Sequence, residues 1–117
     1  MRIPLEERRR HERITAPALT LQLDDSVYRT HDWSMGGFMI EGYRGRLSPG
    51  ALVVLRQIAA LDGTLAEVNV RARVVRADPG RGRLMVAFLS MDAAACSILR
   101  DHMAVRRRFL ISGQPTL

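Results

Sequence analysis

Apolar and polar side chains alternate through the second half of the chain, and this alternation restricts the fold more than any other feature. Every second residue from 68 to 74 is apolar, namely Val68, Val70, Ala72 and Val74. Side chains of a β-strand point alternately to opposite faces, so the pattern predicts a strand with one buried face. The turn sequence Asp78-Pro79-Gly80 follows, and alternation returns at Leu84, Val86 and Phe88. We therefore expect residues 65–77 and 84–88 to pair as a hairpin.

The first half of the chain contains three further strand patterns and one longer apolar stretch. Leu19, Leu21 and Leu23 alternate with polar residues, and Asp24-Asp25-Ser26 then supplies a turn. We expect a second strand over residues 27–31 and a third that begins at residues 38–40. The segment 51–61 is apolar enough for a strand or a helix. Its β-favouring residues and the Pro-Gly and Asp-Gly turns on either side favour a strand.

The spacing of apolar residues changes from two to between three and four over residues 90–108. Ala95, Cys96, Leu99 and Met103 then share one face, and Asp92 can cap the first turn. Arginines in the last turn complement the helix dipole. These features predict a C-terminal helix. Cys96 is the single cysteine, so it cannot form an internal disulfide, and we expect it to be a small packed residue.

Length and charge narrow the functional classes. A chain of 117 residues is expected to form one domain. No apolar run approaches the roughly 20 residues of a membrane span, and no apolar segment follows the N-terminal arginines as a secretory signal requires. We therefore expect a cytoplasmic chain. All 18 basic residues are arginine and the net charge is +6, which favours an acidic partner such as a nucleotide, a nucleic acid or an anionic surface.

The N-terminal segment carries a dense run of arginines, which are Arg8, Arg9, Arg10 and Arg13. Alone, such a run indicates only a solvated charged segment. Arg9 and Arg13 are four residues apart, and each guanidinium can bind a phosphate bidentately or the O6/N7 edge of a guanine. We expect residues 1–14 to form an arm that an anion orders, or else to begin with a short helical turn at Pro4.

A second polar segment, Asp32-Trp33-Ser34-Met35-Gly36-Gly37-Phe38, changes the interpretation of the first. Asp32 can accept hydrogen bonds from the ring N–H and amino group of guanine, and Ser34 can donate or accept. Gly36 and Gly37 permit a tight turn and a close approach of the backbone. Asp32 and Ser34 can also satisfy backbone groups in the turn itself. Trp33 lies between them and is expected to point inward. Together the two segments imply a flat, anionic ligand that contains guanine.

These segments resemble the two-part signature of PilZ domains, which bind the bacterial second messenger cyclic di-GMP. The PilZ signature is two arginines separated by three residues and, downstream, Asp or Asn, one residue, Ser, two residues and Gly. Its first half is matched by Arg9 and Arg13, and its second half by Asp32, Ser34 and Gly37. The resemblance covers nearly the whole chain. It implies a mainly β fold, a six-stranded antiparallel β-barrel with a C-terminal α-helix at residues 15–110, between the arm at 1–14 and a tail at 111–117.

The resemblance also implies a receptor that has no catalytic activity and no cofactor besides its ligand. The ligand-binding residues would be Arg8, Arg9, Arg13, Asp32, Ser34, Gly36 and Gly37. In the family, an arginine directly before the first signature arginine goes with binding of an intercalated pair of messenger molecules, and Arg8 stands at that position. On binding, the arm would close onto the barrel and create a surface for a downstream protein partner.

Further arginines lie on the predicted last hairpin: Arg71, Arg73, Arg76 and Arg83. Arg73 and Arg76 in particular could extend the ligand surface, since several phosphates and base edges need more than two guanidinium groups. An ordinary exposed strand face explains these residues equally well.

Two other interpretations stay open. One is a basic interaction module that binds nucleic acid or an acidic protein through the arm and Arg106-Arg107-Arg108, without cyclic di-GMP. The other is a PilZ-like adaptor that has lost its ligand. The histidines, which are His11, His31 and His102, lack the spacing of metal ligands, so no metal site is expected. No nucleophile, base and orienting group can be assembled, so we do not expect an enzyme.

Overall fold

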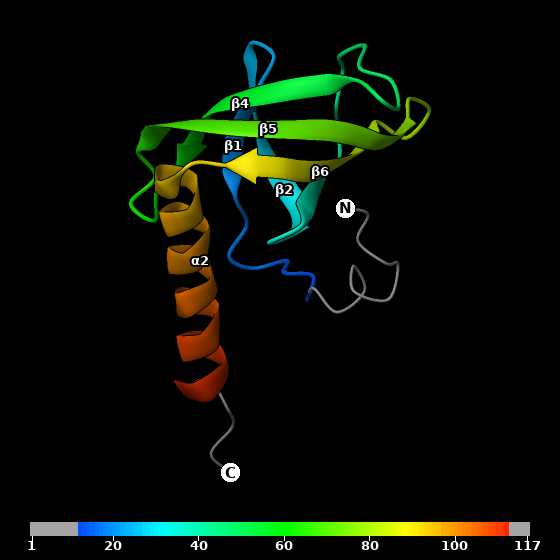
Figure 1. The fold of residues 1–117 in the computed structure, drawn as a ribbon. Coiled ribbons are helices and arrows are strands. Elements are labelled where there is room, and N and C mark those ends of the chain that lie inside the picture. The colour runs from blue at the N-terminus through cyan, green and yellow to red at the C-terminus, as the bar shows by residue number, and fades with distance from the viewer. Residues whose placement is uncertain (1–11, 113–117) are drawn as a thin grey trace.

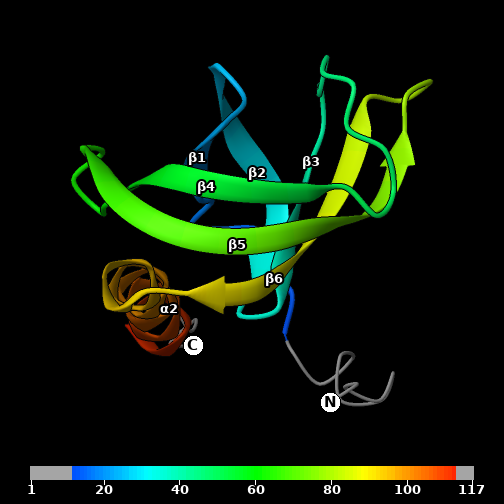
Figure 2. The ribbon, with the colours of Figure 1, turned by 45° about the horizontal axis from the view of Figure 1, so that its top comes forward.

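The computed structural model describes the backbone of residues 12–112 and the side chains of residues 12–106. In this part of the chain, six antiparallel strands close into a barrel, and one helix extends from one end of it (Figure 1). The elements are β1 (Thr20–Leu23), β2 (Ser26–Ser34), β3 (Gly37–Ile40), β4 (Leu52–Ala59), β5 (Leu65–Asp78), β6 (Arg83–Met91) and α2 (Ala93–Ser112). The order around the barrel is β1-β2-β3-β6-β5-β4. Figure 2 shows the strands curving round a single interior. The predicted six-stranded barrel with a C-terminal helix is confirmed.

The hairpin of β5 and β6 behaves as its alternation predicts. β5 has 14 residues and pairs with both β4 and β6, so it joins these two strands in the barrel wall. Val70 and Val74 point inward and are buried, whereas Arg71 and Arg73 are exposed on the outer face. One face of the hairpin therefore builds the core and the other presents cations.

The strand β2 is longer than the sequence indicated, because it continues through Ser34 instead of ending at His31. The register of β2 against β3 shifts between Thr30 and Asp32. Such a bulge adds one unpaired residue and lets the strand continue into the polar segment, for which the sequence predicted a turn. Only Met35 and Gly36 form the turn to β3. Of the seven residues of the polar segment, five thus lie in strands and two in the turn.

Trp33 is the largest fully buried side chain, as its position between two polar residues predicted. Its indole N–H donates a hydrogen bond to the carbonyl of Pro17 at 2.8 Å, which satisfies the one polar atom that burial removes from water. The backbones of Trp33 and Ile14 exchange hydrogen bonds of 2.7 and 2.9 Å. Ile14 is only 1% exposed, so the chain joins the barrel wall at this residue.

The helix α2 begins at the predicted cap. Asp92 Oδ1 accepts a hydrogen bond from the N–H of Ala95 at 3.1 Å, and Asp92 Oδ2 accepts one from the N–H of Asn69 at 3.0 Å. One carboxylate therefore caps the helix and fastens it to β5. Leu99 is buried on the face that packs against the barrel, whereas Cys96 is half-buried. None of the described helical residues form a segment with the length and hydropathy required to cross a membrane.

Candidate functional site

The two halves of the polar pattern meet at one side of the barrel. Asp32 and Ser34 flank the inward-pointing Trp33, so their side chains face outward from the end of β2. The main chain of Ile14 pairs with Trp33, and this places the preceding Arg13 beside them. Arg13 Nη2 forms an ion pair with Asp32 Oδ1, and Arg13 Nη1 donates to Ser34 Oγ at 3.5 Å. Residues 19 and 21 positions apart thus share one cluster.

The members of this cluster differ in their access to solvent. The side chain of Arg13 is 42% exposed and that of Asp32 is 19% exposed. Ser34 is buried, and its hydroxyl accepts a hydrogen bond from the N–H of Gly36 at 3.0 Å, as in other turns closed by serine. An ion pair with partly exposed partners contributes about 0–1 kcal/mol to stability. The pair therefore positions Arg13 without fixing it strongly.

Gly37 has a structural reason to be glycine. It pairs with Ala87 of β6, and a Cβ at this position would lie 2.2 Å from the carbonyl oxygen of Val86. The neighbouring Gly36 accepts a hydrogen bond from the N–H of Phe88 at 2.9 Å, so the turn is fastened to β6. Close packing of β3 against β6 thus accounts for Gly37. Contact of either glycine with a ligand stays a prediction.

The register places Arg73 and Arg76 on the same outer face as the cluster. One row of paired residues crosses four strands through Asp32, Met39, Met85 and Arg76. The next row runs through Ser34, Gly37, Ala87 and Arg73. Neighbouring strands are about 4.8 Å apart, so three steps span about 14 Å along the surface. The two arginines lie at the far edge of the face that begins at Asp32.

The apolar surface that lies between Asp32 and Arg76 was not predicted from the sequence. Met39 and Met85 lie side by side on the outer face and line a small cavity of about 140 Å³ together with Arg76, Asp78, Arg81 and Arg83. Arg83 is held by Glu41, whose other oxygen lies 2.9 Å from His31 Nδ1. The only available signal was that both methionines occupy outward positions of alternating strands, and their pairing requires the sheet order.

The helix reaches the N-terminal segment through one ion pair. Arg106 Nη2 lies 2.7 Å from Glu12 Oε1, and Arg106 is 21% exposed. Arg106 was assigned above to a possible basic cluster, yet its guanidinium is engaged within the chain. The side chains of Arg107 and Arg108 lie outside the described residues.

The predicted roles of Arg8 and Arg9, and the mobility of the arm, also concern residues outside the described part of the chain. Arg13 is the one signature arginine whose surroundings are described. Between residues 12 and 106, no three His, Cys, Asp or Glu side chains gather in a way that could hold a metal ion.

Comparison with known proteins identifies the class to which this fold and cluster belong. The family profile of the PilZ domain matches residues 7–104, which is most of the chain and includes both halves of the PilZ signature. The chain therefore belongs to the PilZ domain family.

The chain was also compared with solved structures and with curated protein sequences. The inhibitor of motility MotI/DgrA of Bacillus subtilis superposes with a TM-score of 0.59 at 19% identity. The match covers 92% of this chain and 56% of that protein, so this chain spans little more than half of its length. At this identity the likeness shows a shared fold. No curated protein sequence matches the chain closely enough to count as a relative.

Proposed function

We propose that the chain is a receptor for cyclic di-GMP and binds it on the outer face of β2 and β3. The observation that carries the proposal is the contact of Arg13 with Asp32 and Ser34, which assembles described residues from both halves of the PilZ signature. Membership of the PilZ domain family supports it as well.

The two charged side chains of the cluster, those of Asp32 and Arg13, would each find a complementary group on the ligand. Asp32 would accept hydrogen bonds from the ring N–H and amino group of one guanine. Arg13 would bind a phosphate, or the O6/N7 edge of a guanine, through its planar guanidinium. Arg9 would supply the second guanidinium, and Arg8 would favour a second, intercalated molecule. Binding would involve no bond making or breaking, and the chain would act as a receptor and not as an enzyme.

The outer face beyond Asp32 suits a ligand larger than one nucleotide. Met39 and Met85 offer a polarisable apolar surface on which a base can lie. Arg76 stands at the far end of this row, and Arg73 at the end of the next, where each could meet a phosphate or a base edge. In this proposal, Arg73 and Arg76 of β5 extend the ligand-binding surface beyond the cluster around Asp32.

The ion pair of Arg13 and Asp32 suggests how the empty and bound states differ. Without ligand, each group neutralises the other. With ligand, phosphate takes over the guanidinium and guanine takes over the carboxylate, so the two charges stay satisfied. The pair is weak enough to be exchanged in this way. Arrangement of the arm against the barrel would then present a new surface to a protein partner, in the cytoplasm where such a messenger would be sensed.

Isothermal titration with cyclic di-GMP at moderate salt tests the proposal, with cyclic di-AMP as a control of equal charge and GTP as a control that contains guanine. We expect selective binding of cyclic di-GMP. Two ligands per chain would support the role given to Arg8, and the substitution R8A should then reduce the ratio to one. Absence of selectivity, with an affinity that falls steeply with salt, would instead indicate nonspecific binding of phosphates and would contradict the receptor.

Substitutions in the cluster make the test specific. R13A and D32A should each weaken binding roughly 10- to 100-fold, as expected for loss of a charge-assisted hydrogen bond of about 1.5–3 kcal/mol. R13A should change the stability of the ligand-free chain by no more than about 1 kcal/mol. The matched control is R29A, which removes an exposed arginine of the same strand. Equal losses in R29A and R13A would show that only total charge matters.

A further inference from the structure

A larger cavity lies at the end of the barrel opposite α2, away from Arg13 and Asp32. It has a volume of about 600 Å³ and lies between the loop that joins β3 to β4 and the turn that joins β5 to β6. Figure 1 places this loop and this turn at the end of the barrel remote from the helix. Cavities of roughly 300–1,000 Å³ are the usual size of small-molecule sites.

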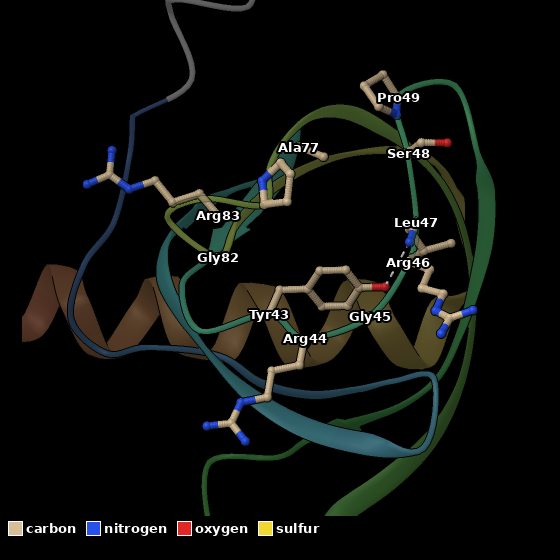
Figure 3. A pocket seen from close by; sticks show the side chains of 11 residues that line it. Tyr43, Arg44, Gly45, Arg46, Leu47, Ser48, Pro49, Ala77, Gly82 and Arg83 are labelled. Carbon is tan, nitrogen blue, oxygen red and sulfur yellow. Dashed lines mark hydrogen bonds between the residues drawn. The ribbon is translucent and has the colours of Figure 1, made fainter.

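The walls of this cavity are held by hydrogen bonds. The N–H of Tyr43 donates to the carbonyl of Gly82 at 2.8 Å, which joins the loop to the turn. The hydroxyl of Tyr43 donates to Asp24 Oδ2 at 3.0 Å and accepts from the N–H of Leu47 at 3.2 Å. A Cβ on Gly45 would lie 2.0 Å from this hydroxyl, so the tight loop requires glycine there. The ring of Tyr43 is thus fixed in the middle of the site (Figure 3).

The cavity is lined by apolar residues, and all of its charged lining residues are positive. Tyr43, Leu47 and Ala77 are half-buried and pack against the core, and Pro49 and Pro79 add apolar surface. The charged lining residues are Arg44, Arg46 and Arg83, and no carboxylate is among them. Figure 3 shows the three arginine side chains extending outward around Tyr43.

Arg44 and Arg46, the two arginines of the loop, are not neutralised by any described carboxylate. Arg83 is bound to Glu41, with Nε 3.0 Å from Oε2. Arg44 and Arg46 are exposed and form no ion pair with any residue in the 12–106 part of the chain. The carboxylate of Asp24, which lies behind the Tyr43 hydroxyl, is already engaged. Two guanidinium groups therefore stand at the rim of an apolar cavity without a described counter-ion.

We propose that this cavity is a second binding site, for a small anion with a flat apolar body, such as an aryl carboxylate or an aryl phosphate. The apolar body would lie against Tyr43 and Leu47, where its burial supplies the binding energy. The anionic group would reach Arg44 and Arg46 at the rim, where guanidinium groups bind carboxylate or phosphate bidentately. A cation of the same shape would meet only positive charge. The proposal does not rest on cyclic di-GMP binding, although Arg83 lines both this cavity and the smaller one beside Met39 and Met85.

Two-dimensional amide NMR of the whole chain tests the site, with 2-naphthoate as the anionic probe and 2-naphthylmethylammonium as its charge-reversed counterpart. We expect 2-naphthoate to shift the amide signals of Gly45, Leu47 and Gly82 in a saturable manner. The cationic probe should bind at least tenfold more weakly. The absence of shifts at these amides, or equal binding of both probes, would overturn the proposal.

A pair of double variants separates the site from the net charge of the protein. R44A/R46A should weaken 2-naphthoate binding at least fivefold. R29A/R56A removes the same charge from two exposed strand positions and should leave binding unchanged. Equal weakening in both double variants would overturn the site. The dispersion of the amide spectrum shows whether each variant is folded. Titration with cyclic di-GMP is a separate measurement, and its outcome does not decide whether the cavity binds 2-naphthoate.

Discussion

Glu12 and Arg106 form an ion pair of 2.7 Å between the segment that carries Arg13 and the helix α2. The same helix packs against the base of the site through His102, whose ring meets the indole of Trp33 edge to face at 6.2 Å. Trp33 lies between Asp32 and Ser34 in the sequence. Two separate contacts thus join α2 to the residues around the proposed ligand site.

The Glu12 carboxylate is expected to oppose an anionic ligand, and Arg106 to reduce this opposition. At low salt, E12Q should strengthen cyclic di-GMP binding two- to fivefold, because it removes a negative charge beside Arg13. R106A should weaken binding by a similar factor, because it leaves the carboxylate without its counter-ion. Charges about 8 Å apart in a solvated region interact by about 0.5–1 kcal/mol, which corresponds to these factors. Titration of both variants measures the effect.

Salt and a remote carboxylate control this prediction. The two effects should shrink as salt screens the charges. D25N, in the turn between β1 and β2, removes an exposed carboxylate elsewhere and should leave binding unchanged. Changes of equal sign in E12Q and R106A would contradict an electrostatic role for the pair.

The packing of Gly37 against β6 predicts a large loss of stability on adding one methyl group. In G37A, the new Cβ would approach the Val86 carbonyl to 2.2 Å and the Cα of Ala87 to 3.1 Å, and both are backbone atoms that cannot rotate away. We expect a loss of about 2–3 kcal/mol in urea unfolding, since overpacking commonly costs about 1–3 kcal/mol. G80A is the control, because its Cβ would meet only Asp78 Oδ1 at 3.6 Å. It should stay within about 0.5 kcal/mol of the parent, and comparable losses would refute this explanation.

The two hydrogen bonds of Asp92 predict a graded series of variants. D92A removes both the cap on Ala95 and the acceptor for Asn69, and we expect a loss of about 2 kcal/mol. D92N keeps one side-chain oxygen and should lose about half as much. The exposed Asp101 on the same helix supplies the control D101N, which should change stability little. Urea unfolding of the three variants checks the order, and a D92A loss no larger than that of D101N would contradict the capping role.

The fold could be predicted from the sequence wherever a local pattern is compatible with only one structure. Alternation at Val70 and Val74 predicted an inward face because a strand allows no other arrangement. The end of β2 could not be predicted in the same way. The bulge between Thr30 and Asp32 arises from its pairing with β3, and periodicity within one strand contains no information about its partner.

In the candidate site too, some features could be predicted from the sequence and others depend on strand pairing. The resemblance to the PilZ signature, and not periodicity, predicted that Arg13 and Asp32 would bind one ligand, whereas their direct contact without ligand was not predicted. The row from Asp32 through Met39 and Met85 to Arg76 depends on β3 lying next to β6, more than 40 residues away along the chain. The cavity around Tyr43 depends likewise on a loop and a turn that only the closed barrel brings together. Long-range register is therefore the information that the single sequence lacked.

Tyr43 should titrate above the range of an ordinary tyrosine. Burial raises the pKa of Tyr43 above 10.0, and the hydrogen bond and negative charge of Asp24 raise the pKa further, although the N–H of Leu47 opposes them. The folded state therefore holds the phenolic proton more tightly than the unfolded state does. The corresponding stability is fully present below pH 10, and it is lost as the pH rises through the folded-state pKa.

The ultraviolet absorbance of tyrosinate measures this titration as the difference between the parent chain and Y43F. The difference curve should have its midpoint above pH 10, and the fall in stability of the parent above pH 10 should be smaller in Y43F. D24N removes the charge beside the phenol and should move the midpoint downward, while D25N in the same turn should not. A midpoint at or below pH 10 in the parent, or equal shifts in D24N and D25N, would contradict the hydrogen bond between Tyr43 and Asp24 that holds the wall of the cavity.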